Sequence, residues 1–489
     1  MKKSKVIAIL RTLSPDELKK FRDFVHSPFH NKNKNVIRLF EIIRKHYPKF
    51  EESVPEKEKV FKKLFPGKKF NDTVIRILLS DLLKICEEFL SYINFKKNSQ
   101  TELRYLLYEC KERNLDSLFR MNFKSAENSL EGPGNTDITY FLKRYELETA
   151  EVNYLISRDR QSQTGVNVIK QGEYLLCFFL AGILNIAHEL KVQKDVVNAE
   201  FDFNLADKAI QSIDLEGIMK YMKENNFRYY PVISIYYNMY LSYINEDRDE
   251  YYNELKKLVD DNFEMFTRDE KVNLMIILEN ICLSKTSKGN LKFFADLMEI
   301  YRKMLSGNIY LHSEKEYFQI NLFRNMFYTA VIQKEFKWAE KFIKEHINEL
   351  SPEQKEDMEH YSKAVLYFEK NKFESSLEEI SKVKYKYFVY KYDVKLLMLK
   401  SYYELGYFEN ALFLIDSFSH FLSKNRTVSV LEKERFGNFL LNLKSLIKIK
   451  TGSASGMGDD LYRSISGIRV INSRKWLMEK AKELAKSKK

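Results

Sequence analysis

Residues that break helices are scarce in this chain. Its 489 residues include 15 Gly and 8 Pro, whereas average usage would give roughly 34 Gly and 24 Pro. Helix interiors tolerate few of either, because Gly loses much backbone freedom on folding and Pro lacks a backbone donor. The shortage therefore predicts an all-α protein.

Cysteine is scarce as well. The four cysteines, Cys86, Cys110, Cys177 and Cys282, lie far apart and form no Cys-x-x-Cys pair. This spacing argues against a disulfide framework and against a zinc ribbon. It indicates a reducing compartment, so we expect a cytoplasmic protein.

The sequence also lacks a long hydrophobic run. Its most apolar stretch, Tyr174 to Ala187, spans 14 residues, fewer than the roughly 18 expected of a membrane-spanning helix. At the start, Lys2, Lys3 and Lys5 precede the apolar residues Val6 to Leu10, a run shorter than the roughly 7 to 15 residues of a signal peptide. We expect the apolar stretch to be a buried core helix, and we expect no transmembrane span.

Motifs for catalysis or metal binding are missing from the sequence. His26 and His30 are four residues apart, but Pro28 between them breaks the helix that would bring both rings to one metal. The glycines of residues 452–458 have the wrong offsets for a phosphate-binding loop, and they follow a helix rather than a strand. The sequence therefore predicts no catalytic residue, no cofactor and no metal, and we expect a protein that is not an enzyme.

Charge is distributed unevenly along the chain. Residues 1–100 carry 23 Lys+Arg and 12 Asp+Glu, and residues 463–489 carry 9 and 2, which gives these ends net charges of +11 and +7. The remainder is mildly acidic, with a net charge of −6. Basic ends suit nucleic acid, an anionic membrane surface or an acidic partner. An AT-rich genome would also enrich the chain in lysine, and we give this explanation of the basic ends the same weight.

A Lys-rich segment near the N-terminus is the best candidate for binding nucleic acid. It also contains Phe61, Phe65 and Phe70. Such a cluster can neutralise backbone phosphates, although lysines on solvated helix faces are also ordinary. The candidate phosphate contacts are Lys57, Lys59, Lys62, Lys63, Lys68 and Lys69.

Helix start and stop signals predict a small basic helical module in residues 1–97. Ser14 and Asn71 are predicted N-caps, Pro15 suits the first helical position, and Pro28 ends the first of these helices. The predicted helices span about 15–26, 35–47, 55–65 and 71–95.

Helical patterns continue through the rest of the chain. A helical connector is predicted at 98–134, with an interruption near Asn114 and a break at Gly132 to Gly134. Residues 451–489 are predicted to form a flexible loop and a basic C-terminal helix capped by Ser473. Between them, helices or hairpins are predicted at 139–161, 166–192, 203–225, 232–261, 270–305, 320–425 and 430–450.

An eight-residue pattern, Phe-x-x-small-x-x-x-Ile, occurs three times between residues 320 and 425. Its small residues are 37 and 35 positions apart. A fixed period of this length, with a small residue that lets a neighbouring helix approach, is typical of stacked helical hairpins. We therefore expect residues 135–450 to form an α-solenoid. The three copies are Phe336/Ala339/Ile343, Phe373/Ser376/Ile380 and Phe408/Ala411/Ile415.

The stretch Tyr402 to Leu412 resembles the tetratricopeptide repeat family. Gly406 falls at the turn between the two helices of a repeat, Ala411 at the small position of the second helix, and Tyr402 at a large position of the first. Ala330 replaces the large residue in the earliest of the three repeats. The resemblance implies a superhelix whose concave face holds a peptide or protein segment.

That resemblance also implies a groove lined by the first helices of successive repeats. The Lys, Asn and Arg residues with which some family members grip a terminal carboxylate are not reproduced at the inward positions. Aromatic and cationic side chains found there can still recognise an extended segment. Their alternative role is to cover the contacts between repeats. The predicted partner-binding residues are Arg324, Tyr328, Tyr361, Lys400 and Tyr403.

Two functions from different classes follow from these patterns. The first is a non-enzymatic scaffold or adaptor, in which a solenoid binds a protein or peptide partner. The second is a nucleic-acid-binding regulator, in which the basic N-terminal module contacts phosphates and the solenoid acts as a sensor. An enzyme without a local motif stays open as a third.

Overall fold

The protein is almost entirely helical. A computed structural model describes residues 1, 4–50, 54–197, 204–313, 316–384, 388–425, 428–452 and 458–487. Within these described ranges the protein has 24 α-helices, helix content is 79%, and no strand occurs. An isolated parallel bridge joins Thr136 and Phe266. The predicted all-α class is confirmed.

Contacts within the chain divide it into two compact units. The first contains Met1–Ser129 and Glu146–Asn167, and the second contains Leu130–Tyr145 and Val168–Lys489. The first unit therefore takes in most of the segment that the sequence analysis set apart as a connector.

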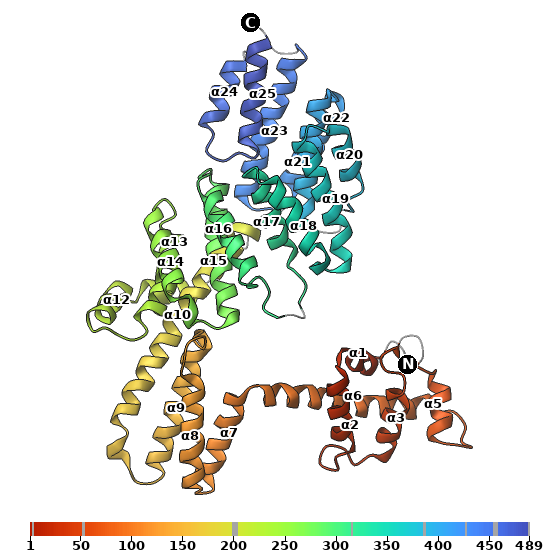
Figure 1. The fold of residues 1–489 in the computed structure, drawn as a ribbon, viewed down its shortest axis with the longest axis vertical. Coiled ribbons are helices and arrows are strands. Elements are labelled where there is room, and N and C mark those ends of the chain that lie inside the picture. The colour runs from red at the N-terminus through yellow and green to blue at the C-terminus, as the bar shows by residue number, and fades with distance from the viewer. Residues whose placement is uncertain are drawn as a thin grey trace. The chain divides into compact units, whose positions relative to one another are not determined.

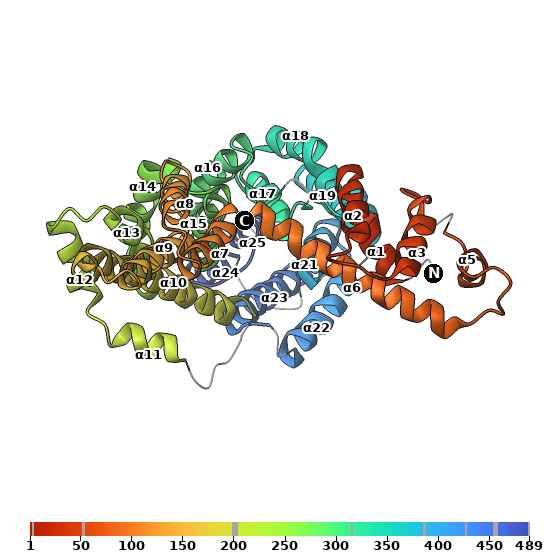
Figure 2. The same cartoon turned by 90° about the horizontal axis from the view of Figure 1, so that it is seen from below.

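In the first unit, several short helices pack around one long helix. The helices are α1 (Lys5–Thr12), α2 (Pro15–His26), α3 (Lys34–Arg44), α5 (Lys57–Leu64) and α6 (Asp72–Lys97). All of the others pack on α6, as Figures 1 and 2 both show. Ser14 caps α2 as predicted, because its hydroxyl accepts from the Glu17 amide while the Glu17 carboxylate accepts from the Ser14 amide. Asn71 caps α6 in the predicted way. This arrangement buries a single apolar core.

The remainder of the first unit consists of two further helices and of parts of two later ones. Helix α7 (Ser99–Glu112) and helix α8 (Asp116–Leu130) are separated at Asn114, where an interruption was predicted and where φ is +57°. Parts of α9 (Ile138–Ile156) and α10 (Gly165–Val197) and the 3-10 helix η1 (Gln161–Gln163) belong to the same unit.

The second unit is a series of packed neighbouring helices. In the order of the chain they are α11 (Leu205–Gln211), α12 (Leu215–Glu224), α13 (Tyr230–Ile244), α14 (Asp249–Asn262), η2 (Phe263–Met265), α15 (Arg268–Ser287), α16 (Phe293–Ser306), α17 (Ile320–Ile332), α18 (Phe336–His346), η3 (Ile347–Glu349), α19 (Pro352–Glu369), α20 (Phe373–Ser381), α21 (Phe388–Leu405), α22 (Phe408–Lys424), α23 (Val430–Lys450), α24 (Gly458–Gly467) and α25 (Arg474–Ser487). Consecutive helices from α13 to α25 pack against each other along most of the series (Figure 1).

One predicted helix is two helices in the structure. The range 203–225 was expected to be continuous, but α11 and α12 are separate. The helix is interrupted before Asp214, because the Asp214 carboxylate accepts from the Gly217 amide and so caps the start of α12. Residue 203 itself lies outside the described residues.

Helix α10 is a core helix on one face only. Tyr174, Cys177 and Leu180 are buried as predicted, whereas Leu176 and Phe179 are each 39% exposed. Over Gly165–Lys194 it is long and apolar enough to cross a membrane, by length and composition only, with 33% of its most apolar window buried. A core helix of a soluble protein passes the same test.

The predicted repeat period reappears in the backbone of the turns. Lys334, Asn371 and Gly406 each adopt a positive φ, of +60°, +56° and +76°, in the turn between two helices. Each residue precedes the small residue of its repeat by five positions, so the turns share the spacing of 37 and 35 residues. Each turn is closed in the same way, since the next amide donates to a carbonyl five residues earlier, at 2.8 to 2.9 Å.

The small residues of the three repeats are fully buried. Ala339, Ser376 and Ala411 are all 0% exposed. The Ser376 hydroxyl donates to the Ala364 carbonyl oxygen at 2.8 Å, so a hydroxyl is accommodated where the other two repeats have a methyl group. Burial of this position is therefore common to all three copies.

The C-terminal segment contains a helix that the sequence analysis missed. Helix α24 packs with α23 and α25, which Figure 1 shows side by side in blue. Gly458, the first residue of α24, lies very close to α25. A Cβ added there would be 2.5 Å from the Ala481 carbonyl oxygen, so a residue larger than glycine would force a shift. Ser473 precedes α25 as predicted, but its hydroxyl donates to the Asn472 side chain. Most of the predicted flexible loop, at 453–457, lies outside the described residues.

Candidate partner-binding face

The predicted partner-binding residues lie on α17, α19 and α21, the first helices of the three repeats. Arg324 on α17 forms a bidentate ion pair with Asp393 on α21, with 2.6 Å between Nη2 and Oδ1. This pair links two repeats that are not neighbours in sequence, across α19. We call this surface of α17, α19 and α21, on which the Arg324–Asp393 pair lies, the inner face.

Two of the five predicted residues are core residues. Tyr361 and Tyr403 are each 1% exposed. The Tyr403 ring contacts Trp476 of α25, with 5.4 Å between ring centroids, and the Lys450 ammonium lies 4.6 Å from the centre of the same ring. In this structure these tyrosines hold helices together, in line with the alternative that such side chains cover contacts between repeats.

Lys400 and Tyr328 are half-buried on the inner face. The Lys400 ammonium lies 4.6 Å from the centre of the Phe368 ring, a cation–π contact. Lys400 forms no ion pair with any described residue. Burial lowers the pKa of Lys400, while the negative charges of Glu369 and Asp393 act to raise it. Burial likewise raises the pKa of the Tyr328 hydroxyl.

The inner face also carries acidic groups that the sequence analysis did not select. Asp393 is 9% exposed and holds Arg324. Glu369 remains accessible to solvent, but protein atoms around it displace enough water to raise its pKa. The repeat pattern points only to aromatic and cationic positions, and no local motif marks an acidic partner some 70 residues from its arginine.

The Lys-rich segment of the first unit is divided between paired and unpaired lysines. Lys57 pairs with Asp72 and Lys62 with Glu58, both at 2.9 Å. The other four candidate phosphate contacts are exposed and form no ion pair with a described residue; they are Lys59, Lys63, Lys68 and Lys69. The interleaved phenylalanines mostly pack with one another, since the Phe61 ring contacts both Phe65 and Phe70.

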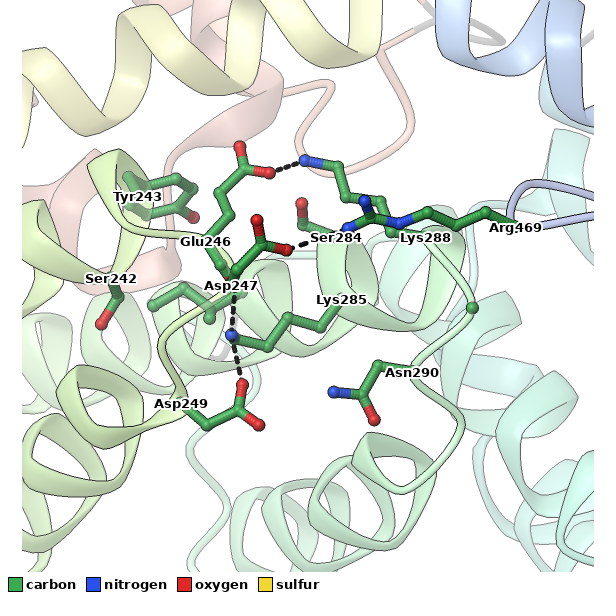
Figure 3. Close-up of a pocket in the computed structure, with 12 residues that line it drawn as sticks. Ser242, Tyr243, Glu246, Asp247, Asp249, Ser284, Lys285, Lys288, Asn290 and Arg469 are labelled. Atoms are coloured by element: carbon green, nitrogen blue, oxygen red, sulfur yellow. Dashed lines mark hydrogen bonds and ion pairs between the residues drawn. The ribbon is translucent and has the colours of Figure 1, made fainter.

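A cavity of about 370 Å³ in the second unit is lined by charges that neutralise one another (Figure 3). Lys285 is 6% exposed and donates to Asp249 at 2.6 Å. Arg469, from the turn between α24 and α25, pairs with Asp247 at 2.9 Å. Because the lining cations already have acidic partners, we assign this cavity to the contact between the C-terminal segment and α13 to α15. The sequence analysis did not predict it.

The thiols have the environment of structural cysteines. All four are buried and unpaired. Burial raises the pKa of Cys86, Cys177 and Cys282 to about 12, which leaves the thiolate form unpopulated at neutral pH. Within the described ranges, no three His, Cys, Asp or Glu side chains are grouped so that they could hold a metal ion. No protein-family model, no curated protein and no solved structure matches the chain.

Proposed function

We propose that this protein is a non-enzymatic cytoplasmic scaffold that holds an extended protein segment on the inner face. In this proposal residues 135–450 form an α-solenoid, and the repeats at about 320–425 are tetratricopeptide-like. The equal turn geometry and the buried small residues of the three repeats support that description.

The observation that carries the proposal is the environment of the Lys400 ammonium group. A lysine on a helix surface usually extends into water, but this ammonium is drawn over Phe368 and lacks an ion pair among the described residues. Tyr328 adds a hydroxyl on the same face, and Glu369 adds an acceptor. An extended segment presents both peptide carbonyls and peptide amides, so donors and an acceptor on one face suit its backbone.

This proposal is tested by selecting peptides that bind the full chain from a random library and measuring their affinities by calorimetry. We expect Lys400→Glu to weaken binding at least tenfold, which corresponds to about 1.4 kcal/mol. Lys424→Glu is the matched control, because Lys424 is exposed at the end of α22, away from the inner face. Equal binding by both variants would mean that the inner face does not hold the segment.

A second candidate function rests on the four unpaired lysines of the first unit. We propose, as the alternative, that Lys59, Lys63, Lys68 and Lys69 contact phosphates of a nucleic acid. Filter binding at increasing salt is the test, since each neutralised phosphate contributes roughly −0.9 to the slope of log affinity against log salt for duplex DNA. Changing all four to Glu should abolish binding, whereas Lys62→Glu, at a lysine already paired with Glu58, should have a smaller effect. If the unaltered chain forms no complex at low salt, this candidate fails.

A further inference from the structure

A second, smaller cavity of the second unit has a different character from the one in Figure 3. Its volume is about 160 Å³, and its lining comes from the start of α9, from α10 and from α15. None of the described residues that line it is Lys or Arg, although the chain as a whole carries a net charge of +12. Two carboxylates, Glu189 and Glu270, are part of the lining. The cavity is therefore lined by acidic groups without a lining Lys or Arg, although burial raises the pKa of Glu270.

The floor of the cavity contains a histidine with unused hydrogen-bonding capacity. His188 is 5% exposed, and its ring lies against Tyr243 with 4.5 Å between centroids. Its Nδ1 atom is buried and has no hydrogen-bond partner among the residues that the structure describes. Burial lowers the pKa of His188 to about 4, so the ring is neutral near pH 7 and one ring nitrogen is an acceptor. A buried polar atom without a partner is costly, which favours a ligand that supplies one.

Glu270 lies in the same cavity and is 6% exposed. Its carboxylate accepts from the Tyr236 hydroxyl and, at 3.3 Å, from the Asn273 amide. A carboxylate has about four acceptor positions, so these two bonds leave capacity for a further donor. Both contacts fix the orientation of the group before any ligand arrives. Asn273 and Glu189 are exposed and mark the mouth of the cavity.

The lining also contains aliphatic side chains, namely Val192 from α10 and Ile276 and Ile277 from α15. Acceptors together with methyl groups fit a ligand with a donor-rich head and a short apolar stem. A volume of 160 Å³ corresponds to about five water-sized groups of roughly 30 Å³ each.

We propose that this cavity binds a primary alkylammonium group. The ammonium has three donors and no acceptor, and it would donate to the Glu270 carboxylate, to a ring nitrogen of His188 and to an amide oxygen of the lining. The alkyl stem would lie along Val192 and Ile276. This site is separate from the inner face and does not depend on the function proposed for it. The same chemistry is offered by a free small amine and by a lysine side chain of a partner protein.

The test uses the full chain and two pairs of probes. In the first pair, n-butylamine is compared with 1-butanol, which has a stem of the same length and a neutral head. We expect n-butylamine to bind in calorimetry and 1-butanol to show at least tenfold weaker binding. Equal binding of the two would overturn the proposal, because the carboxylate would then contribute nothing. In the second pair, Nα-acetyl-lysine amide is compared with its Nε-acetylated form. Binding of the free lysine derivative points to a partner's side chain, whereas binding of n-butylamine alone points to a free amine.

Two substitutions locate the site. Glu270→Gln keeps an acceptor for Tyr236 but removes the charge, and His188→Phe keeps the ring contact with Tyr243 but removes both nitrogens. We expect each to weaken n-butylamine binding at least tenfold, while Glu264→Gln, at an exposed residue outside the cavity, should change nothing. For the unaltered chain, the 15N signals of the His188 ring should shift during titration with n-butylamine. Unshifted His188 signals at saturation would overturn the proposal even if a variant failed to fold.

Discussion

The module of α1 to α6 and the repeats of α17 to α22 bury their apolar residues in different ways. In the module, α1, α2, α3 and α5 all pack on α6, and α3 also packs on α2 and α5, so the helices share one common core. In the repeats, each helix packs on its neighbours along the chain, and the few longer-range pairs join first helices such as α17 and α19. The first pattern produces a single shared core. The second produces a row of helices, in which each helix is buried mainly by its neighbours along the chain.

This difference has consequences for stability. A single core is expected to unfold in one cooperative step, because removing any helix exposes α6. A row is expected to behave as a sum of local units and interfaces, so that a defect weakens its neighbours most and distant helices least. The predictions below separate these behaviours, beginning with the largest expected effect.

The largest effect is expected from Phe21→Ala in the module. Phe21 is 0% exposed, and its ring contacts Phe40 and Phe89 at centroid distances of 5.0 and 5.1 Å. Truncation of a fully buried Phe typically costs about 3–5 kcal/mol. Hydrogen exchange should then accelerate together in α1, α2, α3, α5 and α6. Phe29→Ala is the control and should be almost silent, since Phe29 is 90% exposed. Faster exchange confined to α2 would contradict the single-core description.

A pH-dependent effect is expected where α15, α16 and α17 meet. Glu279 on α15 is 4% exposed and accepts from the Tyr301 hydroxyl and the Asn325 amide, each at 3.0 Å. Burial raises the pKa of Glu279 from 4.5 to about 7. The folded protein therefore holds this proton more tightly than the unfolded chain, and stability falls as pH rises from about 4.5 to about 7.

Glu279→Gln should remove this decline. The amide oxygen of Gln can still accept from Tyr301 and Asn325, but the side chain no longer titrates. Between pH 4 and pH 8 the variant should gain about 3 kcal/mol relative to the unaltered chain. Urea unfolding of both proteins at pH 4 and pH 8 measures this difference in unfolding free energy. Hydrogen exchange in α15 to α17 then shows whether the difference is local to these helices. Parallel pH profiles of the two proteins would show that Glu279 does not titrate in this window.

A smaller and more local effect is expected from Ala411→Trp in the repeats. Ala411 is 0% exposed between packed helices, so the larger side chain should overpack the interface at a typical cost of about 1–3 kcal/mol. Exchange should accelerate in α21, α22 and α23 and remain unchanged in α17. Lys424→Ala, at an exposed residue of the same helix, is the control. Acceleration that extends equally to α17 would show that the repeats unfold as one core.

Phe408→Ala provides a second comparison between the repeats and the module. The structure leaves this side chain half-buried, so Phe408→Ala should cost less than the roughly 3–5 kcal/mol typical of a fully buried Phe. The loss should also be smaller than that of Phe21→Ala in the same denaturant series. A loss as large as that of Phe21→Ala would mean that the repeat interface is more closed than its exposure indicates.

The sequence predicted elements whose causes are local and missed those whose causes are distant. The Ser14 cap, the break at Asn114 and the repeat spacing depend on a few adjacent residues, and all three appear in the structure. Helix α24 was missed because the glycines and serines before it resemble a loop, and only its packing with α25 explains Gly458. The exposed apolar residues of α10 were missed because hydropathy does not tell which faces find a partner.

The candidate site was predictable to a similar extent. The repeat register predicted Arg324, Tyr328 and Lys400 for one face, and in the structure they lie on α17 and α21 with half-buried side chains. It could not show that Tyr361 and Tyr403 would be buried, since Tyr suits both a core and a surface. The acceptors Asp393 and Glu369, and the cavity around His188, depend on helices that are far apart in sequence. No periodic pattern records such contacts.

The smallest effect is expected at the turns, where the three repeats place different residues in the same conformation. Lys334, Asn371 and Gly406 occupy equivalent positions with positive φ. This conformation costs a residue with a Cβ roughly 1–2 kcal/mol, whereas Gly adopts it freely and Asn tolerates it. Lys334→Gly should therefore stabilise its repeat by about 0.5 kcal/mol, because the relief of strain exceeds the added freedom of Gly in the unfolded chain. Gly406→Ala should destabilise by about 1 kcal/mol through strain alone, since no atom lies within 4 Å of the added Cβ. Urea midpoints of the two variants should move in opposite directions, and Asn371→Gly should lie between them. If Lys334→Gly destabilises instead, the shared turn geometry is not what sets the stability of these repeats.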